Sequence, residues 1–204
     1  MFPLGSVLVP SAGLPLHVFE ERYRRMVRDC LAADEQFGVV LIERGSEVGG
    51  ADVRSRVGTI ARIVEAVELD DGRWAVGAVG VRRLRVVAWL ADDPYPRAEV
   101  EPWDDPPVEP GHAADVEAAI VLLRRALALA AEVGDPAAPA TIELASDPVI
   151  AGYQAIAVAP IGPLDQQRLL CAPSAEVRIS ELVGMLHDEI EVLGFRLGSP
   201  PGEV

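Results

Sequence analysis

The clearest periodic pattern in the chain lies near its amino terminus, where apolar residues recur at helical spacing. Residues three, four, seven and eight positions apart lie on one side of an α-helix, and arginines fill most of the positions between them. The spacing predicts a helix that packs an apolar stripe against a core and presents a mostly cationic side to solvent. The stripe consists of Tyr23, Met26, Val27, Cys30 and Leu31.

A short extended segment precedes this helix. Residues 2–10 form an apolar run that ends in proline, and Ser11, Ala12 and Gly13 have the composition of a turn. Residues 14–19 are again mostly apolar and lead into the helix. We therefore expect a strand, a tight turn and a core-facing helix in the amino-terminal part of the chain.

Apolar runs rich in β-branched residues predict further strands after the helix. Residues 37–42 form such a run, which suits a strand buried on both faces. Residues 43–56 are polar and contain several glycines, so they predict a loop.

The clearest hairpin surrounds the Asp-Asp-Gly sequence at residues 70–72, which is a tight-turn signal. The flanking residues 57–69 and 73–90 are both strand-like. The two-residue alternation of the second strand is imperfect. A bulge or bend at Gly77 or Gly80 would explain this irregularity.

The composition changes after a last strand at residues 98–103, which is expected at a sheet edge because its proline cannot donate to a ladder. Residues 104–111 are rich in aspartate and proline, and apolar residues then recur at helical spacing. The predicted helices span residues 112–133, 148 to near 160, 163–171 and 174–194, and Asp147 is the expected N-cap of the second. The predicted division is a β subdomain at residues 1–105, a helical subdomain at residues 106–195 and a flexible tail at residues 196–204.

The net charge of −14 is distributed unevenly. Residues 1–103 hold 13 arginines against 16 acidic residues, whereas residues 104–204 hold 5 arginines against 16 acidic residues. The carboxy-terminal half should therefore repel polyanions, which argues against a nucleic-acid surface across the whole molecule.

All 18 basic residues are arginines, and the chain contains no lysine. A Walker A phosphate loop and Schiff-base chemistry both need a lysine side chain. No apolar run is long enough for a membrane span, and the amino terminus lacks the basic start and continuous apolar core of a signal peptide. We therefore expect a soluble cytoplasmic protein that is not a P-loop ATPase.

The cysteines and histidines give no sign of a metal or cofactor site. Cys30 and Cys171 are too few for a disulfide framework or a metal cluster, and both are expected as small core side chains. His17 has no cysteine or aspartate at ligand spacing. We expect its ring to hold the turn before the first helix by a hydrogen bond.

Three blocks near the amino terminus, at residues 2–10, 14–20 and 22–27, occur in order with compatible gaps. Together they resemble the opening signature of the Lon protease amino-terminal (substrate-binding) domain family, in its stand-alone bacterial form without the ATPase and peptidase domains. Glu21 stands where the family usually has proline, and both residues suit a first helical turn. The lack of lysine also excludes the Ser-Lys dyad of the Lon peptidase domain.

The resemblance extends over nearly the whole chain. It implies an α+β fold, with a PUA-like β pseudobarrel of about six strands and one early helix, followed by a C-terminal helical subdomain. It also implies a non-catalytic protein that recognises exposed or unfolded polypeptide segments, as an adaptor or regulator of proteolysis beside a protease or chaperone partner. An open sheet edge could bind such segments by β-augmentation. The candidate peptide-binding residues are Leu14, Leu16, Phe19, Arg22, Arg82 and Arg83.

Two other functions stay open at this point. The PUA-like fold suggests an RNA-binding module. However, the arginine cluster at residues 82–85, with Arg62 and Arg73 nearby, is more readily explained by pairing with Glu65, Glu68 or Asp71. The other is a small-molecule hydrolase with an unrecognised site, although no Gly-x-Ser-x-Gly motif occurs. Nucleic acid and membranes are not expected partners, and a homodimer remains open.

Overall fold

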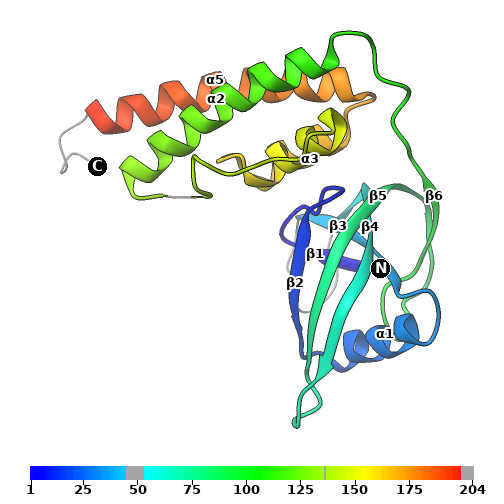
Figure 1. Ribbon diagram of the computed structural model, residues 1–204. Coiled ribbons are helices and arrows are strands. Elements are labelled where there is room, and N and C mark those ends of the chain that lie inside the picture. The colour runs from blue at the N-terminus through cyan, green and yellow to red at the C-terminus, as the bar shows by residue number, and fades with distance from the viewer. Residues whose placement is uncertain (45–52, 136, 199–204) are drawn as a thin grey trace. The chain divides into compact units, whose positions relative to one another are not determined.

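A computed structural model describes residues 1–44, 53–135 and 137–198 (Figure 1). Contacts within the chain divide it into two compact units, Met1–Asp104 and Asp105–Val204. The described elements of the first unit are β1 (Phe2–Leu4), β2 (Gly13–Val18), α1 (Glu21–Leu31), β3 (Gln36–Arg44), β4 (Val53–Glu68), β5 (Trp74–Trp89) and β6 (Ala98–Pro102). Those of the second unit are α2 (His112–Val133), α3 (Pro148–Val158), α4 (Pro163–Leu170) and α5 (Ala175–Gly198).

The strands of the first unit form one curled mixed sheet. Hydrogen-bonded neighbours follow the order β1-β3-β4-β5-β2, and β6 pairs with the second half of β5. β1 runs parallel to β3, whereas the other pairs are antiparallel. The sheet curls into a half-barrel with β1 and β2 at the two ends of this order (Figure 1). This arrangement, followed by helices, confirms the predicted PUA-like α+β fold.

Two bulges interrupt the pairing of the long β4–β5 hairpin. In the first bulge, Val64 is the extra residue on β4, opposite the bond between Gly77 and Ala78. In the second, Val81 is the extra residue on β5, next to Gly80. A Cβ atom at Gly80 would lie 2.3 Å from the Val9 carbonyl oxygen, so glycine is required for this close approach. The irregularity predicted at these glycines is confirmed.

Helix α1 packs its apolar stripe into the core of the half-barrel. Tyr23, Met26 and Val27 are buried, and the Tyr23 ring centroid lies 4.3 Å from that of Phe2. The last two positions of the stripe are partly buried against the same cluster. The helix begins at Glu21, whose carboxylate interacts favourably with the positive end of the helix dipole.

The segment predicted as a loop at residues 43–56 is partly strand. β3 continues to Arg44 and β4 begins at Val53, where the two strands pair. The polar sequence misled the prediction because main-chain pairing with a neighbouring strand does not require apolar side chains. The middle of the predicted loop, residues 45–52, lies outside the described residues.

The helices of the second unit form where the sequence predicted them. Asp147 caps α3, because its Oδ1 accepts hydrogen bonds from the N–H groups of Val149 and Ile150, both at 3.0 Å. Gly134 ends α2 in the left-handed conformation, at φ 85°. None of the described helices is long and apolar enough to cross a membrane.

Helix α5 continues to Gly198, so its predicted end at Gly194 is wrong. A glycine inside a helix costs only about 1 kcal/mol relative to alanine. The neighbouring Leu193 is buried, and its packing keeps this turn helical. Residues 199–204 of the predicted tail lie outside the described residues.

The two cysteines have different environments. Cys171 is exposed where α4 ends, which corrects its prediction as a core side chain. Cys30 is partly buried, and burial raises the pKa of its thiol. A raised pKa leaves less of the reactive thiolate at a given pH.

We therefore expect iodoacetamide to alkylate Cys171 faster than Cys30 at mildly alkaline pH. The rate at Cys30 should continue to rise with pH beyond the range in which an ordinary thiol ionises, because burial raises its pKa. Mass spectrometry of the two cysteine peptides would measure both rates. Equal rates at the two thiols would contradict the burial of Cys30.

Candidate peptide-binding groove

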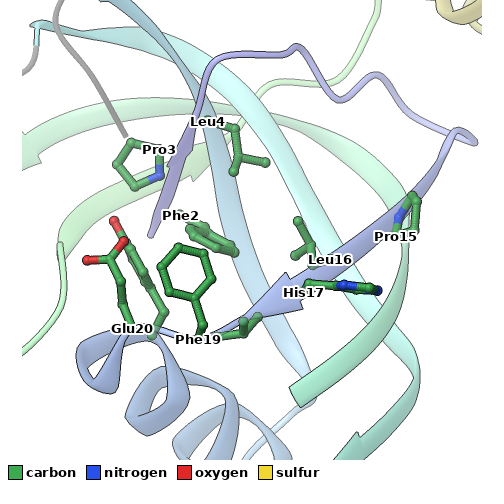
Figure 2. Close-up of a pocket in the computed structure, with 10 residues that line it drawn as sticks. Phe2, Pro3, Leu4, Pro15, Leu16, His17, Phe19 and Glu20 are labelled. Carbon is green, nitrogen blue, oxygen red and sulfur yellow. The ribbon is translucent and has the colours of Figure 1, made fainter. Parts of the chain in front are cut away.

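A groove opens between the two end strands of the sheet, β1 and β2, next to the start of α1 (Figure 2). Its volume is about 230 Å³, and most of its lining side chains are apolar. Figure 2 shows Phe2 and Leu4 on the β1 side and Leu16 on the β2 side. The complete lining consists of Phe2–Leu4, residues 15–20 and Tyr23.

Along β2, alternate side chains face the core and the solvent. Leu14 and Leu16 are partly buried and Val18 is buried, whereas Pro15 and His17 are exposed. Proline favours an extended conformation in the residue before it, and its missing N–H suits a strand at a sheet edge. The sequence therefore keeps β2 extended along the groove. One of its edges has no strand partner among the described residues.

Phe19 and Glu20 form one end of the groove (Figure 2). The Phe19 side chain is 59% exposed, which is unusual for a phenylalanine. Glu20 accepts a hydrogen bond from Arg22 Nε at 3.0 Å, and the Arg22 guanidinium lies 4.6 Å from the centroid of the Tyr23 ring. This end of the groove thus combines an exposed aromatic ring with a carboxylate that is already paired.

The arginines of α1 are paired with carboxylates. Arg24 lies 2.9 Å from Glu21, and Arg25 lies 2.9 Å from Asp29. The remaining arginines of the helix also contact acidic side chains. The predicted cationic face therefore offers little unpaired positive charge, and the groove is better suited to apolar segments than to acidic ones.

Four of the six predicted binding residues lie on β2 or near its junction with α1. Leu16 and Phe19 line the groove itself. Leu14 lies on β2 but packs partly against the core. Arg22 lies beside the groove and pairs with Glu20.

The other two predicted residues, Arg82 and Arg83, are not part of the groove lining. Arg82 donates two hydrogen bonds to the carboxylate of Asp104, at 3.2 and 2.5 Å. Arg83 is only 1% exposed, and its guanidinium lies 4.1 Å from the centroid of the Trp103 ring. A side chain this buried does not contact a segment bound at the surface, so the inclusion of Arg83 in the predicted site is wrong.

The arginine cluster pairs within the unit, as favoured from the sequence, but mostly with partners other than the predicted ones. Arg73 contacts Asp71 at 2.7 Å, which is a predicted pair. Arg85 lies 3.9 Å from Glu101 and 4.2 Å from the centroid of the Trp103 ring. With these side chains buried or paired, the cluster does not present the open cationic surface that phosphate binding requires.

His17 does not have the role predicted for it. It is exposed on β2, and its ring makes no hydrogen bond with any described residue. The reason is the alternation of the strand, which turns this side chain to solvent. In the part of the chain that the structure describes, no group of three or more histidine, cysteine, aspartate or glutamate side chains could hold a metal ion.

Sequence reasoning missed the second wall of the groove, which Phe2 and Leu4 contribute from β1. Both were recognised as part of an apolar strand, but periodicity does not show which strand lies opposite. The parallel pairing of β1 with β3, in the register Phe2 to Val39, places them there. The only sequence signal was the succession of apolar blocks on either side of the turn at Ser11.

Comparisons with known proteins agree on one family. A family model described as the ATP-dependent protease La (LON) substrate-binding domain matches residues 1–188. Lon protease 2 of Herpetosiphon aurantiacus is 30% identical over 93% of this chain, and Lon protease of Anaeromyxobacter dehalogenans is 26% identical over 93%. The chain spans 23% of the length of each of these two relatives.

Two solved structures have a similar fold. The crystal structure of a Lon N-terminal domain protein from Xanthomonas campestris has a TM-score of 0.62 and 29% identity, and covers 90% of this chain and 95% of that chain. The N-terminal domain of Mycobacterium avium complex Lon protease has a TM-score of 0.64 and covers 91% and 97%. At 17% identity, the second similarity concerns the fold alone.

Proposed function

The chain belongs to the family of ATP-dependent protease La (Lon) substrate-binding domains, and from this premise we propose that its β unit binds exposed segments of other polypeptides in the groove between β1 and β2. The family supports a non-catalytic, protein-binding role. The observation that carries the location is the apolar groove itself, which lies between the two end strands of the sheet and has the exposed Phe19 ring at one end.

The chemistry of the groove favours an apolar segment in an extended conformation. Phe2, Leu4 and Leu16 provide apolar walls, and the nearby Glu20 carboxylate is already paired with Arg22. Burial of apolar surface contributes about 25 cal/mol per Å². Such segments are buried in folded proteins and become accessible when a protein is unfolded, so the groove would distinguish unfolded clients from folded ones.

The proposed role of the chain is that of an adaptor or regulator of proteolysis. Because the chain contains no lysine, it can supply neither a Walker A lysine nor a Ser-Lys peptidase dyad. Cleavage would therefore depend on a protease partner, to which this chain would present or withhold the bound segment. A chaperone partner would make the same use of a groove that binds unfolded segments.

Replacing Phe19 by serine is expected to weaken binding of a permanently unfolded client about tenfold, because a phenylalanine side chain that becomes fully buried contributes about 1.5–3 kcal/mol. Reduced and carboxymethylated α-lactalbumin is a suitable client, with affinity measured by fluorescence anisotropy. The melting temperature should stay unchanged, since Phe19 is 59% exposed.

Two matched controls replace similarly exposed apolar residues that do not line the groove. Val64→Ser changes a residue of β4 that is 65% exposed, and Val192→Ser changes a residue of α5 that is 53% exposed. Both should alter the affinity less than twofold. If Val192→Ser weakens binding and Phe19→Ser does not, the helical unit is the binding surface and the proposal is wrong.

A further inference from the structure

We infer that the groove binds its segment as an added β-strand, paired with the free edge of β2. This inference rests on the proposed function and specifies its chemistry. It requires that β2 has main-chain N–H and C=O groups directed away from β5 and toward the groove, and two separate sets of hydrogen bonds determine which residues provide them.

The first set lies at the start of the β2–β5 ladder. Gly80 N–H donates to the Ala12 carbonyl at 2.9 Å, and Ser11 N–H donates to the Gly80 carbonyl at 2.8 Å. Ser11 and Ala12 thus lie together opposite Gly80 in a bulge, and the Ala12 carbonyl faces β5. In an antiparallel ladder, hydrogen-bonded and non-hydrogen-bonded pairs alternate, so Leu14 and Leu16 also direct their main-chain groups to β5.

The second set lies at the far end of β5. Leu69 N–H donates to the Arg73 carbonyl at 2.8 Å, so Arg73 and every second residue after it up to Gly77 direct their main-chain groups to β4. The residues between them, Trp74 and Val76, must then face β2. These are the partners of Val18 and Leu16, so both sets of hydrogen bonds give the same alternation.

The main-chain groups of Gly13, Pro15 and His17 consequently point away from β5. They offer three carbonyl acceptors but only two N–H donors, because proline has none. No described strand pairs with this edge, and the groove lies along it from Pro15 onward. A single proline in an otherwise open edge is also a common protection against uncontrolled pairing between copies.

This geometry defines the class of ligand. In an added strand, the residues opposite Gly13, Pro15 and His17 form the main-chain hydrogen bonds and turn their side chains to solvent. The residues between them turn their side chains to the same face as Leu14 and Leu16 and enter the apolar groove. The preferred ligand is thus an extended segment with apolar residues at alternate positions and no proline at the positions between them.

Adding a proline to β2 at one position and removing one at another tests this inference on the protein. His17→Pro removes an outward N–H that takes no part in the β2–β5 ladder, whereas His17→Ala removes only the ring. We expect His17→Pro to bind the seven-residue peptide Ser-Val-Ser-Phe-Ser-Val-Ser about fivefold more weakly than His17→Ala, since a main-chain hydrogen bond contributes about 0.5–1.5 kcal/mol. Pro15→Ala adds a donor and should tighten binding.

N-methylation of the same peptide tests the inference without changing the protein. A methyl group on the amide of a central serine should weaken binding about fivefold, because this amide faces β2. A methyl group on the neighbouring phenylalanine amide should change the affinity less than twofold. Equal losses at both amides, together with equal affinities of His17→Pro and His17→Ala, would overturn the added-strand mode.

The outcomes also separate this inference from the proposed function. If carboxymethylated α-lactalbumin binds in a Phe19-dependent manner but the peptide does not bind, the ligand class inferred here is wrong and the groove remains the binding site. If neither the client nor the peptide binds the intact chain, the proposed function itself fails.

Discussion

Replacing Met26 by alanine is expected to lower the free energy of unfolding of the β unit by roughly 2–5 kcal/mol. Met26 is 1% exposed and belongs to the core cluster that joins α1 to the sheet. The substitution removes buried apolar surface and leaves a cavity that the surrounding side chains fill only in part. All three tryptophans of the chain lie in this unit, so tryptophan fluorescence during urea denaturation reports its unfolding.

Arg25→Ala is the matched control on the same helix. The Arg25 side chain is 62% exposed, and its contact with Asp29 at 2.9 Å is a surface ion pair. Such pairs contribute little, so the free energy of unfolding should change by less than about 0.5 kcal/mol. Equal losses from the two substitutions would show that the apolar stripe of α1 does not face the core.

Replacing Asp105 by alanine should destabilise the helical unit by roughly 3–5 kcal/mol, because it leaves a buried arginine without its counter-charge. Arg178 on α5 is 2% exposed. Its Nη2 and Nη1 atoms donate to the two Asp105 oxygens at 2.7 and 3.0 Å, and its Nε donates to the Leu169 carbonyl at 3.2 Å. The Tyr153 hydroxyl also donates to Asp105, at 2.8 Å.

Circular dichroism at 222 nm during urea denaturation would measure this loss, since most of the helix lies in the second unit. Arg168→Ala is the matched control, because Arg168 is 65% exposed and forms a surface pair with Glu181 at 3.0 Å. Removal of this surface pair should lower the free energy of unfolding by less than about 1 kcal/mol.

A double substitution identifies the cause of the loss. Asp105→Leu combined with Arg178→Met removes both charges and should recover much of the stability, because neither charge is then left buried and unpaired. The distances indicate that this pair links the start of the unit to its last helix. An unchanged unfolding transition in Asp105→Ala would contradict that role.

Met26 stabilises the core of the β unit, and the pair of Asp105 and Arg178 stabilises the helical unit. The proposed binding uses a different feature, the outer edge of β2. Among the described residues no strand pairs with the outer edge of β2, and the core of the half-barrel is filled from the inner face of the sheet, by side chains such as Val18 and Met26. An open edge and a stable core are therefore compatible in this fold, and a bound segment could pair without rearrangement of the sheet.

The sequence by itself determined the features that depend on neighbouring residues. The stripe of α1, the hairpin turn at residues 70–72 and the capping of α3 by Asp147 all follow from local spacing and turn chemistry, and the structure confirms each of them. The resemblance in the amino-terminal blocks gave the fold and the family. Two of the predicted peptide-binding residues, Leu16 and Phe19, line the groove, because they lie on a segment whose apolar character was evident; their role in binding stays a prediction.

Only the tertiary structure decided which segments meet. The wall formed by Phe2 and Leu4 depends on the pairing of β1 with β3, and a strand's side-chain pattern does not specify its neighbour. Arg83 was predicted at the surface, but Trp103 covers it, from a position twenty residues further along the chain. Contacts between residues so far apart are set by how the sheet curls and pairs, and for that reason the local sequence did not reveal them.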